Sequence, residues 1–137
     1  MKIGAPQEKR SAIMKLITPR AHGYLDYLTV VVFLAAPSLL GFDGLPARLA
    51  WTLAAVHLAM TLATNFPLGL FRRLPFSVHG WIERIVGPTL LVVAFLPGFY
   101  SVGPAFLFFA AMGLVIVAVG WLTDYADAPE PGLVQNP

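Results

Sequence analysis

Two short stretches of the sequence each place a histidine four residues before a carboxylate. The stretches are His22-Gly23-Tyr24-Leu25-Asp26 and His79-Gly80-Trp81-Ile82-Glu83. On a helix, residues at positions i and i+4 share one face, so each stretch would present an imidazole and a carboxylate together. Such a face can bind a proton, a cation or a polar ligand. Alternatively, the two faces pair with each other and fix how the helices dock.

Polar residues at the ends of two further apolar segments belong with these pairs. Asn65 and Asp124 end those segments at the same side of the membrane. Ionisable groups inside a membrane are costly and normally face the interior of the bundle. We therefore expect one polar cluster near the cytoplasmic surface, with Arg20 and Arg84 close enough to neutralise it. Its members are His22, Asp26, His79, Glu83, Asn65 and Asp124.

The histidines also raise the alternative of a bound cofactor. His22 and His79 at equal depth on two helices can ligate a b-type haem. His57 lies in the middle of an apolar segment, and its counterpart in the second half of the chain is Ile116, so it stands outside the duplicated pattern. There it hydrogen-bonds a backbone carbonyl or Thr61, or it ligates a haem or a chlorophyll-type pigment. A metal site made of histidine and carboxylate is a further alternative, but pairs at this spacing arise often and are a weak signal, so we predict no metal ion.

The composition places these residues in a membrane protein. Of 137 residues, 58% are hydrophobic and only 12% are charged, and the mean hydropathy is +0.75. Soluble domains carry about a quarter charged residues. The chain has no cysteine, which excludes disulfides, thiolate metal sites and c-type haem attachment. It has no phosphate-binding loop, nucleophile elbow or zinc-protease motif, so we expect no enzyme.

Four apolar segments reach the length of about 20 residues that a transmembrane helix needs. We predict them at about 19–40, 47–66, 77–96 and 105–123, with Thr18 as an N-cap and Pro19 in the first turn. The transmembrane domain then spans 18–125, between a basic N-terminal segment of residues 1–17 and a polar tail of residues 126–137. Pro88 predicts a kink in the third helix. On the second helix, the small residues Ala55, Ala59 and Ala63 favour close contact within the bundle or with a partner.

The positions of lysine and arginine predict the orientation. Four of these residues precede the first segment and Arg20 lies in its first turn, while Arg72 and Arg73 lie between the second and third segments. Only Arg48 lies at the opposite side of the membrane. Basic residues favour the cytoplasmic side, so both termini should be cytoplasmic. The same pattern accounts for the pI near 9.2 without a nucleic-acid partner.

The two halves of the chain are similar in sequence. Besides the two stretches with histidine, Thr64-Asn65-Phe66 matches Thr123-Asp124-Tyr125, and Pro37 near the first outer turn matches Pro97 near the second. The matches are 57 to 60 residues apart, which is one helical hairpin. Because the first and third helices run in the same direction, we predict two parallel hairpin repeats in an all-α bundle of four transmembrane helices.

This twice-repeated hairpin with a proline near its outer turn resembles the SPW-repeat group of small bacterial membrane proteins. Ala36-Pro37-Ser38 stands where that group carries Ser-Pro-Trp, so the tripeptide is not intact here. The resemblance covers most of residues 18–125. It implies a multi-pass protein of the bacterial inner membrane and supplies no catalytic residues.

Three functional hypotheses follow. The first is a non-enzymatic accessory subunit of a larger membrane assembly, such as a respiratory or photosynthetic complex, since the chain is small and lacks a soluble domain. The second is a transporter or channel that works through the polar cluster, probed by Asp26→Asn with Glu83→Gln. The third is a protein with a haem or pigment ligated by His57, or by His22 and His79. The expected partners are the lipid bilayer and other membrane subunits or further copies of the chain.

Overall fold

The computed structural model describes residues 15–125, and this part of the chain is mostly helical. The long helices are α1 (Pro19–Leu40), α2 (Gly44–Ala63), α3 (Phe76–Ala94) and α5 (Gly103–Leu122), and the short helix α4 (Pro97–Tyr100) precedes α5. Two-residue strands β1 (Thr64–Asn65) and β2 (Leu74–Pro75) pair in parallel. Most of the predicted basic segment and the whole predicted tail lie outside the described residues.

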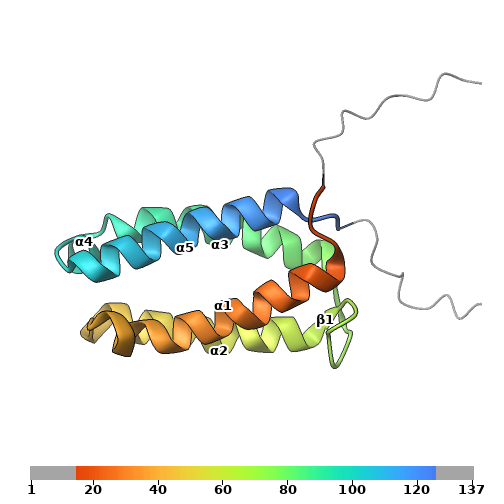
Figure 1. Ribbon diagram of the computed structural model, residues 1–137, viewed down its shortest axis with the longest axis horizontal. Coiled ribbons are helices and arrows are strands. Elements are labelled where there is room, and N and C mark those ends of the chain that lie inside the picture. The colour runs from red at the N-terminus through yellow and green to blue at the C-terminus, as the bar shows by residue number, and fades with distance from the viewer. Residues whose placement is uncertain (1–14, 126–137) are drawn as a thin grey trace, which may run out of the picture.

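The long helices form two antiparallel hairpins, α1 with α2 and α3 with α5 (Figure 1). The hairpins lie side by side. The β1–β2 pairing and both ends of the described chain lie at one end of the molecule, and α4 and the α1–α2 turn lie at the other (Figure 1). We call these the strand end and the α4 end.

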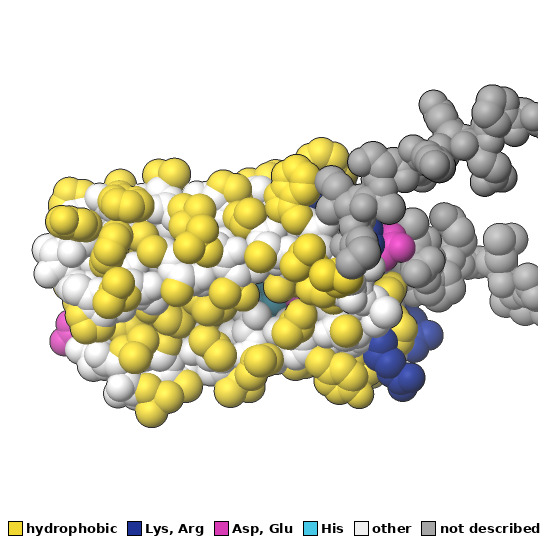
Figure 2. Space-filling view, turned by 45° about the horizontal axis from the view of Figure 1, so that its top comes forward, with side chains coloured by type: hydrophobic (Ala, Val, Ile, Leu, Met, Phe, Trp, Pro, Cys, Tyr) yellow, Lys and Arg dark blue, Asp and Glu magenta, His cyan; other side chains and the backbone are white. Residues whose placement is uncertain are grey.

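Three of the helices, α1, α2 and α5, are long and apolar enough to span a membrane. This confirms the prediction of a mostly helical chain and agrees with that of a membrane protein. The helix α3 is not among the three, and its first half carries His79, Glu83 and Arg84. The visible face of the molecule is covered by hydrophobic side chains along its length, and charged side chains gather at its two ends (Figure 2).

Local chemistry sets both ends of α1. The Thr18 side chain accepts a hydrogen bond from the Ala21 amide at 3.2 Å, and Pro19 occupies the first turn, as the sequence predicts. The helix ends at Gly41, whose φ of 70° lies in the left-handed region that favours glycine.

The other helices differ from their predicted bounds by one to three residues. α2 runs over residues 44–63 rather than 47–66, because Thr64 and Asn65 become extended and pair with β2. α3 covers 76–94 rather than 77–96, and α5 covers 103–122 rather than 105–123. The segment predicted as a helix breaker contains α4, because Pro97 can occupy a first helical turn. α3 continues through Pro88 as one helix.

Small residues bring the helices together, although not the ones predicted on α2. Ala55 and Ala59 are exposed. The alanines of α2 that are buried within the bundle are instead Ala47, Ala50 and Ala54. The predicted stripe is therefore wrong as a contact within the bundle, because the buried face of α2 is rotated away from it. In the second hairpin, a Cβ atom on Gly113 would lie only 2.9 Å from the Gly87 carbonyl oxygen.

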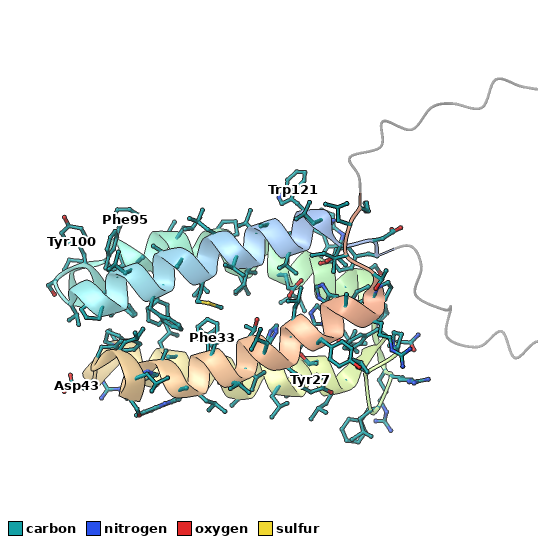
Figure 3. All side chains as sticks on the ribbon, in the orientation of Figure 1. Tyr27, Phe33, Asp43, Phe95, Tyr100 and Trp121 are labelled. Atoms are coloured by element: carbon teal, nitrogen blue, oxygen red, sulfur yellow. The ribbon has the colours of Figure 1, made fainter. Side chains whose placement is uncertain are left out.

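Aromatic side chains fill the space between the two hairpins. Phe33 of α1 points into this space (Figure 3) and packs edge-on against Phe108 of α5, with ring centroids 5.2 Å apart. Phe109 is fully buried beside them. Edge-to-face aromatic pairs are worth about 0.5–1.5 kcal/mol beyond their burial.

Backbone hydrogen bonds join the two hairpins at the strand end. The Asp124 amide donates to the Ile17 carbonyl at 3.0 Å, and the Ile17 amide donates to the Leu122 carbonyl at 3.1 Å. These bonds bring the start of α1 beside the end of α5, while the β1–β2 pairing brings the start of α3 beside the end of α2. The first turns of α1 and α3, which carry the two histidines, are thereby anchored near the ends of α5 and α2.

Candidate metal centre

Four side chains of the predicted polar cluster meet between α1 and α3. His22, Asp26, His79 and Glu83 each offer one nitrogen or oxygen atom, and these four atoms lie within 4.8 Å of one another. Both histidines are fully buried, and the two carboxylates are 2% and 4% exposed. We call these four residues the His–carboxylate cluster.

A threonine holds each histidine of the cluster by its Nδ1 atom. The Nδ1 of His22 lies 2.8 Å from Thr123 Oγ1, and the Nδ1 of His79 lies 2.8 Å from Thr64 Oγ1. Each threonine hydroxyl donates its one proton to a backbone carbonyl at 2.7 Å, that of Val119 or Met60.

The threonines therefore fix the tautomer of both histidines. A hydroxyl that already donates its proton can only accept from the imidazole, so each Nδ1 carries a hydrogen. In the neutral imidazole, the lone pair is then on Nε2. Both Nε2 atoms face the centre of the cluster, where they lie 3.5 Å from each other.

Acceptor atoms converge on this centre. His22 Nε2 lies 3.3 Å from Asp26 Oδ1 and 3.4 Å from Glu83 Oε2. His79 Nε2 lies 3.5 Å from Asp26 Oδ2 and 3.5 Å from Glu83 Oε1. Lone pairs of two neutral imidazoles and two carboxylates repel one another unless a proton or a metal cation lies between them.

The spacing of these atoms fits a coordinated metal ion. In a tetrahedral complex with metal–ligand bonds of about 2.1 Å, neighbouring ligand atoms lie about 3.4 Å apart. The nitrogen–nitrogen distance and the four nitrogen–oxygen distances, which involve both oxygens of each carboxylate, are 3.3 to 3.5 Å, and one atom from each of the four residues can be chosen so that all lie within 4.8 Å of one another. The Oδ2 atom of Asp26 is also buried without a hydrogen-bond partner within residues 15–125. The donor set and the threonines that orient it fit a metal ion held by histidine and carboxylate.

His57, which the sequence places outside the duplicated pattern, also lies against the cluster. Its Nε2 lies 3.5 Å from Asp26 Oδ1, and its ring centroid lies 6.0 Å from that of His79. Among the described residues, neither this Nε2 atom nor the hydroxyl of Thr61, its expected partner, has a hydrogen-bond partner. The sequence carries a signal for this contact. His57 precedes the end of α2 by about as many residues as Asp26 follows the start of α1, so both lie at about the same distance from the strand end.

The two arginines expected to neutralise the cluster do not pair with its carboxylates in the described contacts. The guanidinium of Arg84 lies 5.3 Å from the ring centroids of both Trp81 and Tyr125, as a cation–π contact. Arg20 is exposed. The Tyr125 hydroxyl instead donates to Glu83 Oε2 at 3.0 Å. Burial and the neighbouring carboxylate raise the pKa of Tyr125, so its hydroxyl stays protonated as a donor.

Asn65 and Asp124 lie beside the cluster. Asn65 is buried in β1, and one carboxylate oxygen of Asp124 lies 3.9 Å from Lys15 Nζ. The preceding residue in each case, Thr64 or Thr123, is the one that contacts a histidine. The sequence carries a signal for these histidine contacts, because a threonine directly precedes Asn65 in the first half of the chain and Asp124 in the second.

Aromatic rings close the cluster at the strand end. Phe66 and Phe76 stack with ring centroids 5.7 Å apart, and Phe76 also packs edge-on against His22. This packing explains the glycine after each histidine. A Cβ atom on Gly23 would collide with Phe66, and one on Gly80 would collide with Tyr125.

The geometry does not favour a haem between His22 and His79. A porphyrin plane would have to pass between two Nε2 atoms that are 3.5 Å apart. Carboxylate oxygens of Asp26 and Glu83 lie 3.3 to 3.5 Å from these same nitrogen atoms, where the ring would have to be.

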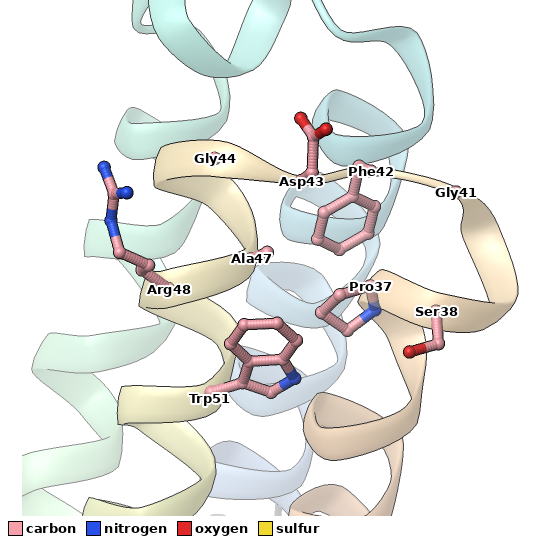
Figure 4. A pocket seen from close by; sticks show the side chains of 9 residues that line it. All are labelled: Pro37, Ser38, Gly41, Phe42, Asp43, Gly44, Ala47, Arg48 and Trp51. Atoms are coloured by element: carbon pink, nitrogen blue, oxygen red, sulfur yellow. The ribbon is translucent and has the colours of Figure 1, made fainter.

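A separate hollow lies at the α4 end. It has a volume of about 490 Å³ and lies where α1 ends and α2 begins (Figure 4). Asp43 and Arg48 are among its lining residues, and the indole N–H of Trp51 donates to the Leu34 carbonyl at 3.2 Å. It shares no residue with the His–carboxylate cluster.

Comparison with known proteins gives no relative for this arrangement. No family model, no curated protein and no solved structure matches the chain.

Proposed function

We propose that this chain is a small integral membrane protein that binds one divalent transition-metal ion through the His–carboxylate cluster. One observation carries the proposal. The threonines hold His22 and His79 by their Nδ1 atoms, so that both Nε2 lone pairs face two buried carboxylates. Metal-binding histidines characteristically donate the N–H of their other ring nitrogen to a fixed acceptor in this way.

Charge supports a divalent ion. With neutral imidazoles, Asp26 and Glu83 carry two negative charges in a segment that lipid surrounds, and a divalent cation neutralises both. A network of protonated histidines paired with carboxylates is the competing explanation. Charge-assisted hydrogen bonds of that kind are about 2.7–2.9 Å long. The observed contacts of 3.3 to 3.5 Å are longer and suit atoms that share a central ion.

The ligand types restrict the metal. Imidazole suits zinc, iron, nickel and copper, and carboxylate oxygen also suits manganese. The chain has no cysteine, so the site offers no thiolate for a softer metal. Zn²⁺ and Co²⁺ are therefore suitable probes, and tetrahedral Co²⁺ reports its geometry through visible absorption.

Titration of the full chain in detergent with Co²⁺ tests the proposal. We expect one equivalent to bind, with the visible bands of a tetrahedral ion, and Zn²⁺ to displace it. Asp26→Asn should abolish these bands while the helical circular dichroism stays unchanged. Asp43→Asn is the matched control, because Asp43 lies at the α4 end. Stoichiometric binding that survives Asp26→Asn, or no binding by the native chain, would overturn the proposal.

For the membrane arrangement, we propose four transmembrane helices in two parallel hairpin repeats, with both termini cytoplasmic in a bacterial inner membrane. The paired contacts support the repeat, since His22 contacts Thr123 while the equivalent His79 contacts the equivalent Thr64. The positions of arginine support the orientation. Cysteine substitutions at Ser77 and Ser101, labelled from either side of the membrane, test whether α3 spans it.

The role of an accessory subunit remains our proposal for the protein as a whole, and so does its resemblance to the SPW-repeat group. The exposed Ala55 and Ala59 on α2 favour it, because small residues let a neighbouring helix approach closely in a membrane. The mass of the native particle in a mild detergent tests this role. A large particle of fixed composition supports it, and one to four copies of the chain alone would contradict it.

The transport and cofactor hypotheses are less well supported. For transport, the cluster is buried and is closed by aromatic rings at the strand end, which favours an ion that stays bound. A pigment or haem at His57 is less well supported because the imidazole Nε2 lies 3.5 Å from Asp26 Oδ1. This spacing suits an ion shared by the two side chains better than a planar cofactor.

A further inference from the structure

A small apolar pocket leads from the side of the bundle to the His–carboxylate cluster. It lies between α1 and α5 and has a volume of about 130 Å³. Asp26 and Glu83 are its charged lining residues, and its walls are mainly aliphatic. Histidine surface shows between the apolar side chains on this face of the molecule (Figure 2). We call this space the lateral pocket, and its apolar lining includes Leu25, Leu28, Val32, Met112, Ile116 and Val119.

One wall of the lateral pocket carries a position at which the two halves of the chain differ in a way that matters for the cluster. His57 precedes Thr64 by seven residues, and Ile116 precedes Thr123 by seven residues. In the first half, the histidine approaches Asp26 with its Nε2 atom at 3.5 Å. In the second half, the aliphatic Ile116 lines the pocket instead, so the cluster has no imidazole at this side.

In a membrane, the mouth of the lateral pocket would face lipid. The helices α1 and α5 that flank it are both apolar enough to span a membrane. Two lining residues, Leu28 and Val115, are 57% and 48% exposed. An opening at this depth admits molecules that dissolve in the bilayer.

The polar end of the lateral pocket selects a hydrogen-bond donor. Carboxylates only accept hydrogen bonds, and the Oδ2 atom of Asp26 has no hydrogen-bond partner in the part of the chain that the structure describes. Glu83 already accepts a hydrogen bond from a phenol within the chain, because the Tyr125 hydroxyl donates to its Oε2 atom at 3.0 Å. A carboxylate that binds a metal through one oxygen keeps acceptor capacity on the other.

The size of the pocket suits one ring. An engineered protein cavity of about 150 Å³ lined by aliphatic and aromatic side chains binds benzene. We propose that the lateral pocket binds the ring of a lipid-soluble phenol, a class that includes quinols, with its hydroxyl donating to the Asp26 or Glu83 carboxylate. This inference goes beyond the proposed metal binding and does not require it.

A pair of matched probes tests the inference in nanodiscs that contain the full chain, with empty nanodiscs as a blank. We expect 4-pentylphenol to bind at least about tenfold more tightly than its methyl ether, 4-pentylanisole, which cannot donate to a carboxylate. Equal binding of the two probes, or no binding above the blank, would overturn the inference. Binding of 1-octanol as tight as that of the phenol would overturn the assignment of a ring.

Two variants locate the bound probe. Ile116→Phe fills the lateral pocket and should abolish binding of 4-pentylphenol, whereas Leu114→Phe adds the same volume on an exposed face of α5 and should leave binding unchanged. If Ile116→Phe fails to fold, the smaller change Val119→Leu should weaken binding. Undiminished binding in a folded pocket variant contradicts the site. Co²⁺ titration of the same samples reports metal binding separately, so failure of one proposal is distinguished from failure of the other.

Discussion

The Nδ1 atom of His22 lies 2.8 Å from the hydroxyl oxygen of Thr123, a residue 101 positions later in the chain. The same contact recurs between His79 and Thr64, again at 2.8 Å. In each case, a histidine near the start of one hairpin is oriented by a threonine at the end of the other. The two hairpins therefore build the His–carboxylate cluster jointly, and neither has a complete set of contacts alone.

Removing the threonine hydroxyl should weaken metal binding without removing a ligand. We expect Thr123→Val to lower the affinity for Zn²⁺ by about 10- to 100-fold, because the imidazole of His22 loses the acceptor that fixes its tautomer and orientation. Thr64→Val should act in the same way through His79. Isothermal titration of the purified chain measures the change.

The matched control is Thr52→Val. The hydroxyl of Thr52 also donates to the carbonyl four residues earlier, that of Arg48 at 2.8 Å, but Thr52 is exposed and contacts no histidine in the described structure. Its substitution should leave the affinity unchanged. Equal affinities of the native chain and the Thr123→Val and Thr64→Val variants would contradict the role of the threonines.

Removing the Tyr125 hydroxyl should destabilise the bundle more than removing that of Tyr27. Tyr125 donates to the Glu83 carboxylate at 3.0 Å, whereas Tyr27 donates to the neutral Leu68 carbonyl at 3.0 Å. Hydrogen bonds to charged groups contribute about 1.5–3 kcal/mol, and those between neutral groups about 0.5–1.5 kcal/mol. Comparison of Tyr125→Phe with Tyr27→Phe in unfolding experiments in mixed micelles measures the difference. A larger loss for Tyr27→Phe would contradict the assignment.

The sequence predicts the histidine and carboxylate pairs because helical periodicity is a local property. Residues four apart share a face whatever surrounds the helix, and the duplication shows that the chain has two such faces. The depth of each residue in the membrane follows from counting along the helix. The proximity of His22, Asp26, His79 and Glu83 is therefore predictable from the sequence alone.

The remaining parts of the site depend on packing between hairpins. His57 reaches Asp26 because α2 is rotated so that Ala54 and Thr61 are buried while Ala55 and Ala59 are exposed. Rotation of a helix that is apolar on all sides is not encoded in its hydrophobic pattern. For the same reason, the spacing of Ala55 and Ala59 does not show which face of α2 packs inside the bundle, and both residues are exposed.

A methyl group on Gly113 should separate α3 from α5. Its Cβ would lie 2.9 Å from the Gly87 carbonyl oxygen, which belongs to a helix backbone and moves only with the helix. Overpacking of this kind costs about 1–3 kcal/mol. We expect Gly113→Ala to lower the Tm of the bundle, whereas Gly98→Ala, whose nearest contact is a Leu45 side chain at 3.8 Å, should not. An unchanged Tm for Gly113→Ala would show that the two helices do not approach this closely.

Introducing the missing imidazole should strengthen metal binding and close the lateral pocket. Ile116→His places a histidine at the position in α5 that corresponds to His57 in α2, where the side chain lines the same pocket as Asp26 and Glu83. We expect a higher affinity for Zn²⁺ and a Co²⁺ spectrum shifted toward five-coordination, because imidazole is an additional ligand of the preferred type. Binding of 4-pentylphenol should fall in the same variant, because the imidazole occupies part of the pocket.

Leu114→His is the control for this gain, since Leu114 lies two residues earlier on α5 and is 61% exposed. A histidine there is too far around the helix to reach the cluster, so affinity and spectrum should match those of the native chain. If Ile116→His binds Zn²⁺ no more tightly than Leu114→His does, the lateral pocket does not lead to the metal. If it binds more tightly while 4-pentylphenol still binds as before, the phenol occupies another surface.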